Sequence, residues 1–220
     1  MFEEVTAIIW DLDGTLYDPS IQMFSEARKL SYEKLAGIKG ISVQEAKHLY
    51  EETYSRLGSN TQTFEFLGLG RAYQLPDRKA VIKVTDEVDR TRFLSKDEKL
   101  IGLFEGLNGY RHVLLTNSGR VGALKTLDAI GLPEKVFSGV FTADDFMHSK
   151  PHPWAFLTAL DFLDEYFHNV LSVGDRDKID IVPARNLGLM TCKVWAGVGE
   201  PETGLADLEL SSVYELKEFL

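Results

Sequence analysis

The segment AIIWDLDGTL, residues 7–16, places two aspartates directly after a short apolar run. This run predicts a buried strand ending at Asp11, and open α/β sheets bind their ligands at that carboxyl edge. Gly14 permits a tight exit from the strand. One carboxylate could attack an electrophile while the other, that of Asp13, handles a proton. The alternative interpretation is a strand followed by an ordinary Asp-Gly turn.

A second polar cluster follows the apolar segment YRHVLLT, residues 110–116. Thr116, Asn117 and Ser118 precede what reads as the start of a helix. Hydroxyl and amide groups, together with the N–H groups of a helix start, suit phosphate oxygens because that helix end carries partial positive charge. Asn and Ser are also common helix caps, and the cluster taken alone favours a capping role.

The segment VLSVGDRDKID, residues 170–180, repeats the plan of an apolar strand that ends in an acid. Asp175 stands where the strand ends, and Asp180 lies near the predicted start of a helix. Hard divalent cations prefer carboxylate oxygens, and Mg²⁺ commonly uses one or two of them with water and substrate phosphate. Asp180 is open to two roles that do not exclude each other, helix N-cap and member of a metal site.

Three charged residues near these segments have both a functional and a structural interpretation. Lys150 could neutralise a phosphate or a nucleophilic carboxylate, although a surface lysine is the commoner case. Arg176 could bind an additional anionic group, but pairing with Asp177 or exposure to solvent is favoured. Asp177 itself is interpreted as a solvated turn residue rather than a metal ligand.

These three segments and Lys150-Pro151, in their order and spacing, resemble the four motifs of the haloacid dehalogenase superfamily of hydrolases. The resemblance spans most of the chain, and its first and fourth motifs are the specific ones. The matching residues are DLDGTL at 11–16, Thr116-Asn117-Ser118, Lys150-Pro151 and GDRDKID at 174–180. Arg176 departs from the common family pattern, which frequently has a small serine at that position.

This resemblance implies a phosphoryl-transfer site. Asp11 would be the nucleophile that forms an aspartyl-phosphate, and Asp13 the general acid for the leaving group and then the base for water. Thr116, with its neighbours Asn117 and Ser118, would bind the substrate's phosphoryl group. Such transfer needs in-line positioning and charge stabilisation, which these residue types can provide.

The same resemblance implies a Mg²⁺ site. Asp175 would bind the ion together with the Asp11 carboxylate and the main-chain carbonyl of Asp13, and Asp180 would belong to the same acidic patch. Lys150 would orient the nucleophile, contact the substrate and balance charge. Crowded carboxylates repel one another and raise each other's pKa unless a cation lies among them, so Mg²⁺ fits this arrangement.

Apolar strands alternate with helical stretches in most of the chain, which predicts an α/β fold with a parallel sheet covered on both faces. The expected core is a Rossmann-like doubly wound sheet. We predict strands near 6–11, 110–116, 139–142, 169–174 and 190–195, and helices near 119–130, 153–166 and 179–187.

Residues 18–95 interrupt this alternation with successive helix signals. Asp18-Pro19 reads as N-cap and first helical position, Ser42-x-x-Glu45 has the spacing of a capping box, and Pro76-Asp77 opens another helical stretch. In the family that the chain resembles, an insertion after the first motif is an α-helical cap. The predicted domains are a core of residues 1–17 and 96–220 and a cap of residues 18–95.

Charge and cysteine content limit the possible partners and location. The formal net charge of −10 argues against nucleic acid and against attraction to an anionic membrane. Cys192 is the only cysteine, which fits a reducing compartment. No run approaches about 18 apolar residues, and we expect a cytoplasmic protein.

The function expected from these observations is a Mg²⁺-dependent phosphatase acting on a small phosphomonoester. One alternative is a phosphomutase of the same superfamily, which passes the phosphoryl group to a sugar hydroxyl instead of water. The other is a module that binds a phosphorylated ligand without catalysis, although the acids expected for catalysis are all present. The substrate and the oligomeric state are left open.

Overall fold

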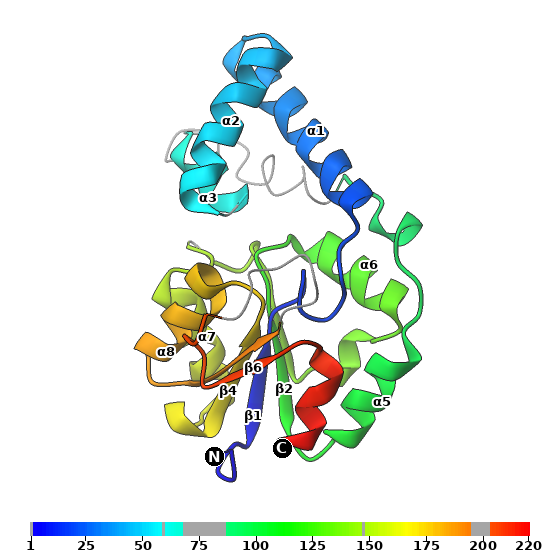
Figure 1. Cartoon of the computed structure of the whole chain (residues 1–220), viewed down its shortest axis with the longest axis vertical. Helices are drawn as coiled ribbons and strands as arrows, with labels where there is room; N and C mark the ends of the chain where they lie inside the picture. Colours follow the sequence, from blue (N-terminus) through cyan, green and yellow to red (C-terminus); the bar gives the residue numbers. More distant parts are fainter. Residues whose placement is uncertain (1, 59, 68–86, 147, 195–202) are drawn as a thin grey trace.

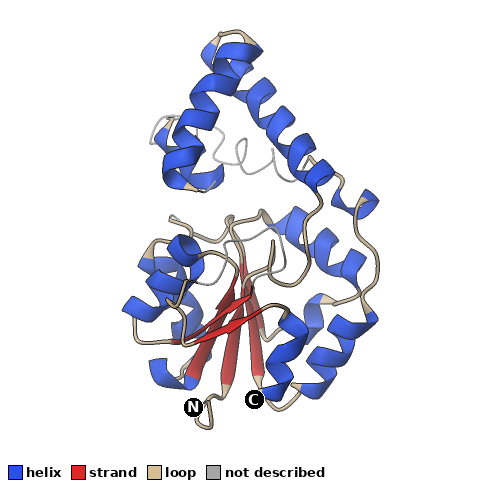
Figure 2. Cartoon of the chain, viewed as in Figure 1, coloured by secondary structure: helices blue, strands red, loops and turns tan. Residues whose placement is uncertain are grey.

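A six-stranded parallel sheet forms the centre of the molecule in the computed structural model (Figure 2). The structure describes residues 2–58, 60–67, 87–146, 148–194 and 203–220. The strand order is β3-β2-β1-β4-β5-β6, so the first strand lies inside the sheet. The predicted α/β fold with a doubly wound parallel sheet is confirmed. The strands are β1 (Ala7–Trp10), β2 (Arg111–Leu115), β3 (Gly139–Phe141), β4 (Val170–Gly174), β5 (Met190–Val194) and β6 (Leu208–Leu210).

The inner strands are apolar on both faces because helices cover both. All residues of β1 and β4 are buried. Ile8 and Trp10 pack in one hydrophobic core, and Ala7 and Ile9 point into the other. Figure 1 shows α5 and α6 on one side of the sheet and α7 and α8 on the other. Their bounds are α5 Glu98–Gly106, α6 Arg120–Ile130, α7 Pro153–Leu163 and α8 Val182–Asn186.

The predicted helix over 179–187 has two parts. A π-helical turn spans Asp177–Ile181, and α8 follows it. Pro183 fits only the first turn of a helix, since it has no N–H to donate. It stands at that position in α8. The residue before it, Val182, donates its N–H to the carbonyl of Asp177, five positions back, which is the hydrogen bond of a π-helical turn. In the described part of the chain, no helix has the length and apolar character needed to cross a membrane.

Between β1 and α5, the described residues form three α-helices: α1 (Ile21–Lys39), α2 (Val43–Leu57) and α3 (Asn60–Phe66). The predicted capping box is confirmed, since the Ser42 hydroxyl accepts from the N–H of Glu45 at 3.2 Å and the Glu45 carboxylate accepts from the N–H of Ser42 at 2.9 Å. The predicted start at Asp18-Pro19 is wrong, because Ser20 is the cap. The predicted start at Pro76-Asp77 lies outside the described residues.

These three helices have a hydrophobic core of their own. Leu35, Tyr50 and Phe64 are at its centre. Figure 1 shows the helices beyond the carboxyl ends of the strands, and polar contacts join them to the rest of the chain. One is the 3.3 Å contact between Arg92 and Glu26. The division into domains at residues 17/18 and 95/96 stays a prediction.

The core of the α1–α3 segment gives the first testable prediction. Leu35→Ala leaves a cavity at a fully buried position, so we expect it to lower the free energy of unfolding by about 2–5 kcal/mol. The matched control in the same helix is Ile38→Ala, at a side chain that is 42% exposed, with an expected change of about 0.5 kcal/mol. Urea denaturation measures both, and equal losses would contradict the placement of this core.

Candidate active site

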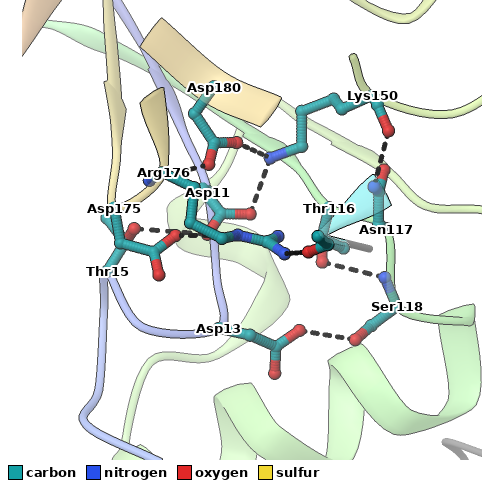
Figure 3. A network of polar contacts seen from close by, with 11 residues as sticks. Asp11, Asp13, Thr15, Thr116, Asn117, Ser118, Lys150, Asp175, Arg176 and Asp180 are labelled. Carbon is teal, nitrogen blue, oxygen red and sulfur yellow. Dashed lines mark hydrogen bonds and ion pairs between the residues drawn. The ribbon is translucent and has the colours of Figure 1, made fainter. Parts of the chain in front are cut away.

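The four predicted segments meet at the carboxyl edge of the sheet (Figure 3). Asp11 follows β1, Thr116 follows β2 and Asp175 follows β4, and these strands are neighbours. The main-chain N–H of Asp11 donates to the carbonyl of Val173 at 2.9 Å, so the sheet ladder fixes the backbone of this residue. The site therefore lies where the chain order of the sheet reverses, the usual ligand position in such folds.

Lys150 is the central cation of the site. Its Nζ lies 2.6 Å from Oδ1 of Asp11 and 2.6 Å from Oδ1 of Asp180. The favoured interpretation as a surface lysine is wrong, since its side chain is only 2% exposed. Burial lowers the pKa of Lys150, but the two carboxylates outweigh this effect and hold it above its ordinary value. The side chain is thus a buried ammonium that compensates two acids.

Three buried acids form a group with the geometry of a metal site. Asp11, Asp175 and Asp180 each offer an oxygen, and these oxygens lie within 4.8 Å of one another. Burial raises the pKa of Asp11 to about 6, with Lys150 opposing the rise and Asp180 adding to it. Burial also raises the pKa of Asp175, whose Oδ1 accepts no hydrogen bond. An all-oxygen set with an unused buried oxygen fits a divalent cation.

The Asp13 carboxylate has partners of its own. It accepts hydrogen bonds from the Ser118 hydroxyl at 2.6 Å, from an Arg90 Nη1 at 2.6 Å and from the Tyr17 hydroxyl. Burial raises the pKa of Asp13, but Arg90 and then the two hydroxyls outweigh it and hold the pKa below its ordinary value. Asp13 is therefore a carboxylate in this arrangement. Its predicted contribution to a metal site through the main chain stays a prediction.

The polar cluster after β2, Thr116, Asn117 and Ser118, forms hydrogen bonds with other residues of the site. Helix α6 is capped by Gly119, without a side-chain hydrogen bond, so the favoured capping interpretation is wrong. Thr116 Oγ1 instead accepts from the N–H of Ser118 at 3.1 Å. Asn117 Nδ2 donates to the carbonyl of Lys150 at 2.8 Å. The cluster thus fixes the backbone of Lys150, the residue that pairs with Asp11. Its binding of phosphate stays a prediction.

Sequence reasoning missed Arg90. This arginine is buried in the 3-10 helix Arg90–Arg92, and its Nη2 also donates to Ser118 Oγ at 3.0 Å. No motif surrounds it, and its partner Asp13 is 77 positions away in the chain. A second addition is Thr15, whose hydroxyl lies 3.2 Å from Oδ2 of Asp11.

Two structural interpretations in the fourth motif are also wrong. Asp177 is buried rather than solvated, and its Oδ2 lies 3.0 Å from Nζ of Lys193 at the end of β5. Arg176 is turned toward Asp175, with Nε 3.5 Å from Oδ1, and toward the carbonyl of Gly58, which accepts from its Nη1 at 3.1 Å. Figure 3 shows the Arg176 guanidinium in front of Asp11.

A family model agrees with this geometry over most of the chain. The model of the haloacid dehalogenase-like hydrolases matches residues 5–188, a range that contains all four motifs but not Lys193. The chain therefore belongs to the haloacid dehalogenase-like hydrolases, as the motifs predicted. The prediction of a hydrolase is confirmed with it.

Individual relatives are similar along nearly the whole chain. The phosphoglycolate phosphatase of Neisseria gonorrhoeae is 26% identical over 211 residues, covering 90% of this chain and 83% of its own. The glyceraldehyde 3-phosphate phosphatase of Methanopyrus kandleri is 26% identical over 200 residues, covering 88% and 85%. The crystal structure of a phosphatase from Thermococcus onnurineus superposes with a TM-score of 0.69 at 23% identity, over 98% of this chain and 97% of its own.

The close contact between Gly174, the last residue of β4, and Asp180 gives a second prediction. A Cβ atom at Gly174 would lie 2.3 Å from Cβ of Asp180, so Gly174→Ala requires a shift of β4 or of the turn that carries Asp180. We expect a loss of about 1–3 kcal/mol in the free energy of unfolding, measured by urea denaturation.

The control for this variant is Gly102→Ala in α5, where an added Cβ meets nothing within 4 Å. Alanine favours a helix over glycine, so this change should stabilise the protein by up to about 1 kcal/mol. A Gly174→Ala protein as stable as the unmodified one would show that the contact with Asp180 is not tight.

Proposed function

We propose that this protein is a Mg²⁺-dependent phosphatase that hydrolyses a small phosphomonoester through an aspartyl-phosphate on Asp11. The observation that carries this proposal is the buried Asp11 carboxylate, held 2.6 Å from Lys150 and grouped with Asp175 and Asp180. The names of the relatives support it, since two of them are phosphatases of small phosphate esters.

Hydrogen bonds to both oxygens hold the Asp11 carboxylate in one orientation, as a nucleophile requires. Oδ1 is bound by Lys150 and Oδ2 by the Thr15 hydroxyl at 3.2 Å. In the first displacement, a carboxylate oxygen forms a bond to phosphorus while the bond from phosphorus to the ester oxygen breaks. Water then attacks the same phosphorus and releases phosphate and free Asp11.

Mg²⁺ would be held by Asp11, Asp175 and Asp180. When bound, it would supply positive charge that reduces the repulsion between the anionic nucleophile and an anionic phosphate. The fit rests on the donor set, which consists of carboxylate oxygens in a buried place. Lys150 would add a second positive charge beside the ion. Its ammonium donates to Oδ1 of Asp11 and to Oδ1 of Asp180.

Asp13 is proposed as the group that moves protons. As a carboxylate bound by three donors, it is ready to take a proton from the water that attacks the aspartyl-phosphate. For the first displacement it must carry a proton to the leaving oxygen. Protonation removes the charge that Arg90 binds, so the acid step costs the energy of this ion pair.

The α1–α3 segment is proposed as the cap of this site. Arg176 donates to the carbonyl of Gly58 at the end of α2 and lies 3.5 Å from Asp175, so this arginine links the segment to the acids. A cover at this place would exclude water from the phosphoryl group and add contacts to the rest of the substrate. We also propose that the protein acts in the cytoplasm and on small molecules.

Replacing the nucleophile tests this mechanism. Asp11→Asn has nearly the same shape but a far weaker nucleophile, so we expect phosphate release to fall at least about 1,000-fold. The measurement is release of phosphate from a panel of phosphomonoesters. The matched control is Asp161→Asn at an exposed position on α7, which should keep full activity. Activity of the Asp11→Asn protein well above background would reject Asp11 as nucleophile.

Metal removal gives a separate prediction. EDTA should abolish phosphate release and excess Mg²⁺ should restore it. Asp175→Asn should raise the Mg²⁺ concentration that gives half-maximal activity at least about 10-fold, because one anionic ligand becomes neutral. Full activity in EDTA would count against a metal-dependent reaction.

A further inference from the structure

Arg176 lies farther from its nearest carboxylate oxygen than the other cations of the site do from theirs. The described structure gives each of the others a carboxylate oxygen at 3.0 Å or less: Lys150 has Asp11 and Asp180, Arg90 has Asp13, and Lys193 has Asp177. Arg176 has Asp175 at 3.5 Å, too far and too poorly aligned for a hydrogen bond.

The hydrogen-bonding capacity of Arg176 is also largely unused. A guanidinium has five N–H donors in a planar fork. Within the described residues, only Nη1 donates a side-chain hydrogen bond, to the carbonyl of Gly58 at 3.1 Å. Nε is buried and donates none. The carboxylates of Asp175, Asp180 and Asp11 stabilise the charge of Arg176, but within the described residues none of them accepts a hydrogen bond from its side chain. The buried Nε–H therefore has no acceptor, and an anion that reached it would satisfy this donor.

Its position suits a part of the substrate other than the reacting phosphate. The guanidinium lies between Asp175 on the core side and Gly58 at the end of α2, and 27% of the side chain remains exposed. Its charge lowers the pKa of Asp11, so it is within electrostatic reach of the nucleophile. Figure 3 shows it extending across the site from Asp175 toward the end of β2.

We propose that Arg176 binds a second anionic group of the substrate, a carboxylate or a second phosphate, close to the phosphate that is hydrolysed. This inference rests on the proposed phosphatase function and specifies its substrate class. A planar guanidinium recognises either group through paired N–H donors, with a geometry that lysine cannot match. A small phosphate ester with a second anion is then preferred over the same ester without it.

The competing role for Arg176 is a purely structural link to the α1–α3 segment through Gly58. The two roles differ in one measurable quantity, the ratio of kcat/KM for an ester with a second anion to that for a counterpart whose only anionic group is the reacting phosphate. Loss of a structural link lowers both values by the same factor. Loss of an anion contact lowers the ratio.

The experiment compares matched substrates. Phosphoglycolate against its amide tests a carboxylate, and ethylene glycol bisphosphate against ethyl phosphate tests a second phosphate. In Arg176→Gln we expect the ratio to fall about 10- to 100-fold for at least one pair, as for loss of a charge-assisted hydrogen bond. Arg176→Lys keeps the charge but not the fork and should give a smaller fall. Arg185→Gln, an exposed arginine of α8, is the control and should leave both ratios unchanged.

An unchanged ratio in Arg176→Gln, including an equal loss for both members of each pair, overturns the inference. Binding separates this failure from a failure of the proposed function. Calorimetry of phosphoglycolate and its amide on the unmodified protein and on Arg176→Gln measures the same preference without turnover. A protein that hydrolyses no ester but binds phosphoglycolate through Arg176 would refute the phosphatase and retain the anion site.

Discussion

The ion pairs of Lys150 with Asp11 and Asp180 are the interaction on which the rest of the site depends. They join the end of β1, the loop before α7 and the π-helical turn, three segments distant in the sequence. Without the ammonium, two buried carboxylates would face each other uncompensated, at a cost of about 3–5 kcal/mol. Asn117 then holds the backbone of Lys150, so the end of β2 supports the same arrangement.

Two other acids of the site are also each paired with a cation. Asp13 has Arg90 and Asp177 has Lys193, and in both pairs at least one partner is buried. Such pairs add little stability relative to an apolar core, but they fix where each acid points. Steric fit has the same effect, since any side chain at Gly14 would meet Oδ2 of Asp175 at 2.4 Å. The acids are therefore held in place by charge on one side and by close backbone on the other.

The features that could be predicted are those that a short stretch of sequence determines. Buried parallel strands are continuous apolar runs, which identified β1, β2 and β4. Length alone did not decide which edge strand could be predicted, since β3 and β6 both have three residues. The strand β3, with the sequence GVF, was predicted, while β6, with the sequence LEL, has a charged residue at its centre and was not. The residues around Lys150 did not indicate its burial, because its partner Asp11 is 139 positions away, and only the family resemblance assigned the two residues to one site. Arg90 was missed for the same reason, while Asp177 was misjudged because the sequence did not indicate that β5 would bring Lys193 beside it.

The separate core of α1–α3 has a consequence for how such a protein can change over evolutionary time. Leu35, Tyr50 and Phe64 pack with one another and belong to neither core of the sheet. Mutations that reshape this helical segment can therefore accumulate without loosening the strands that carry Asp11 and Asp175. In the proposed role of α1–α3 as the cap, such mutations would change which substrate is bound while leaving the acids at the ends of the strands in place.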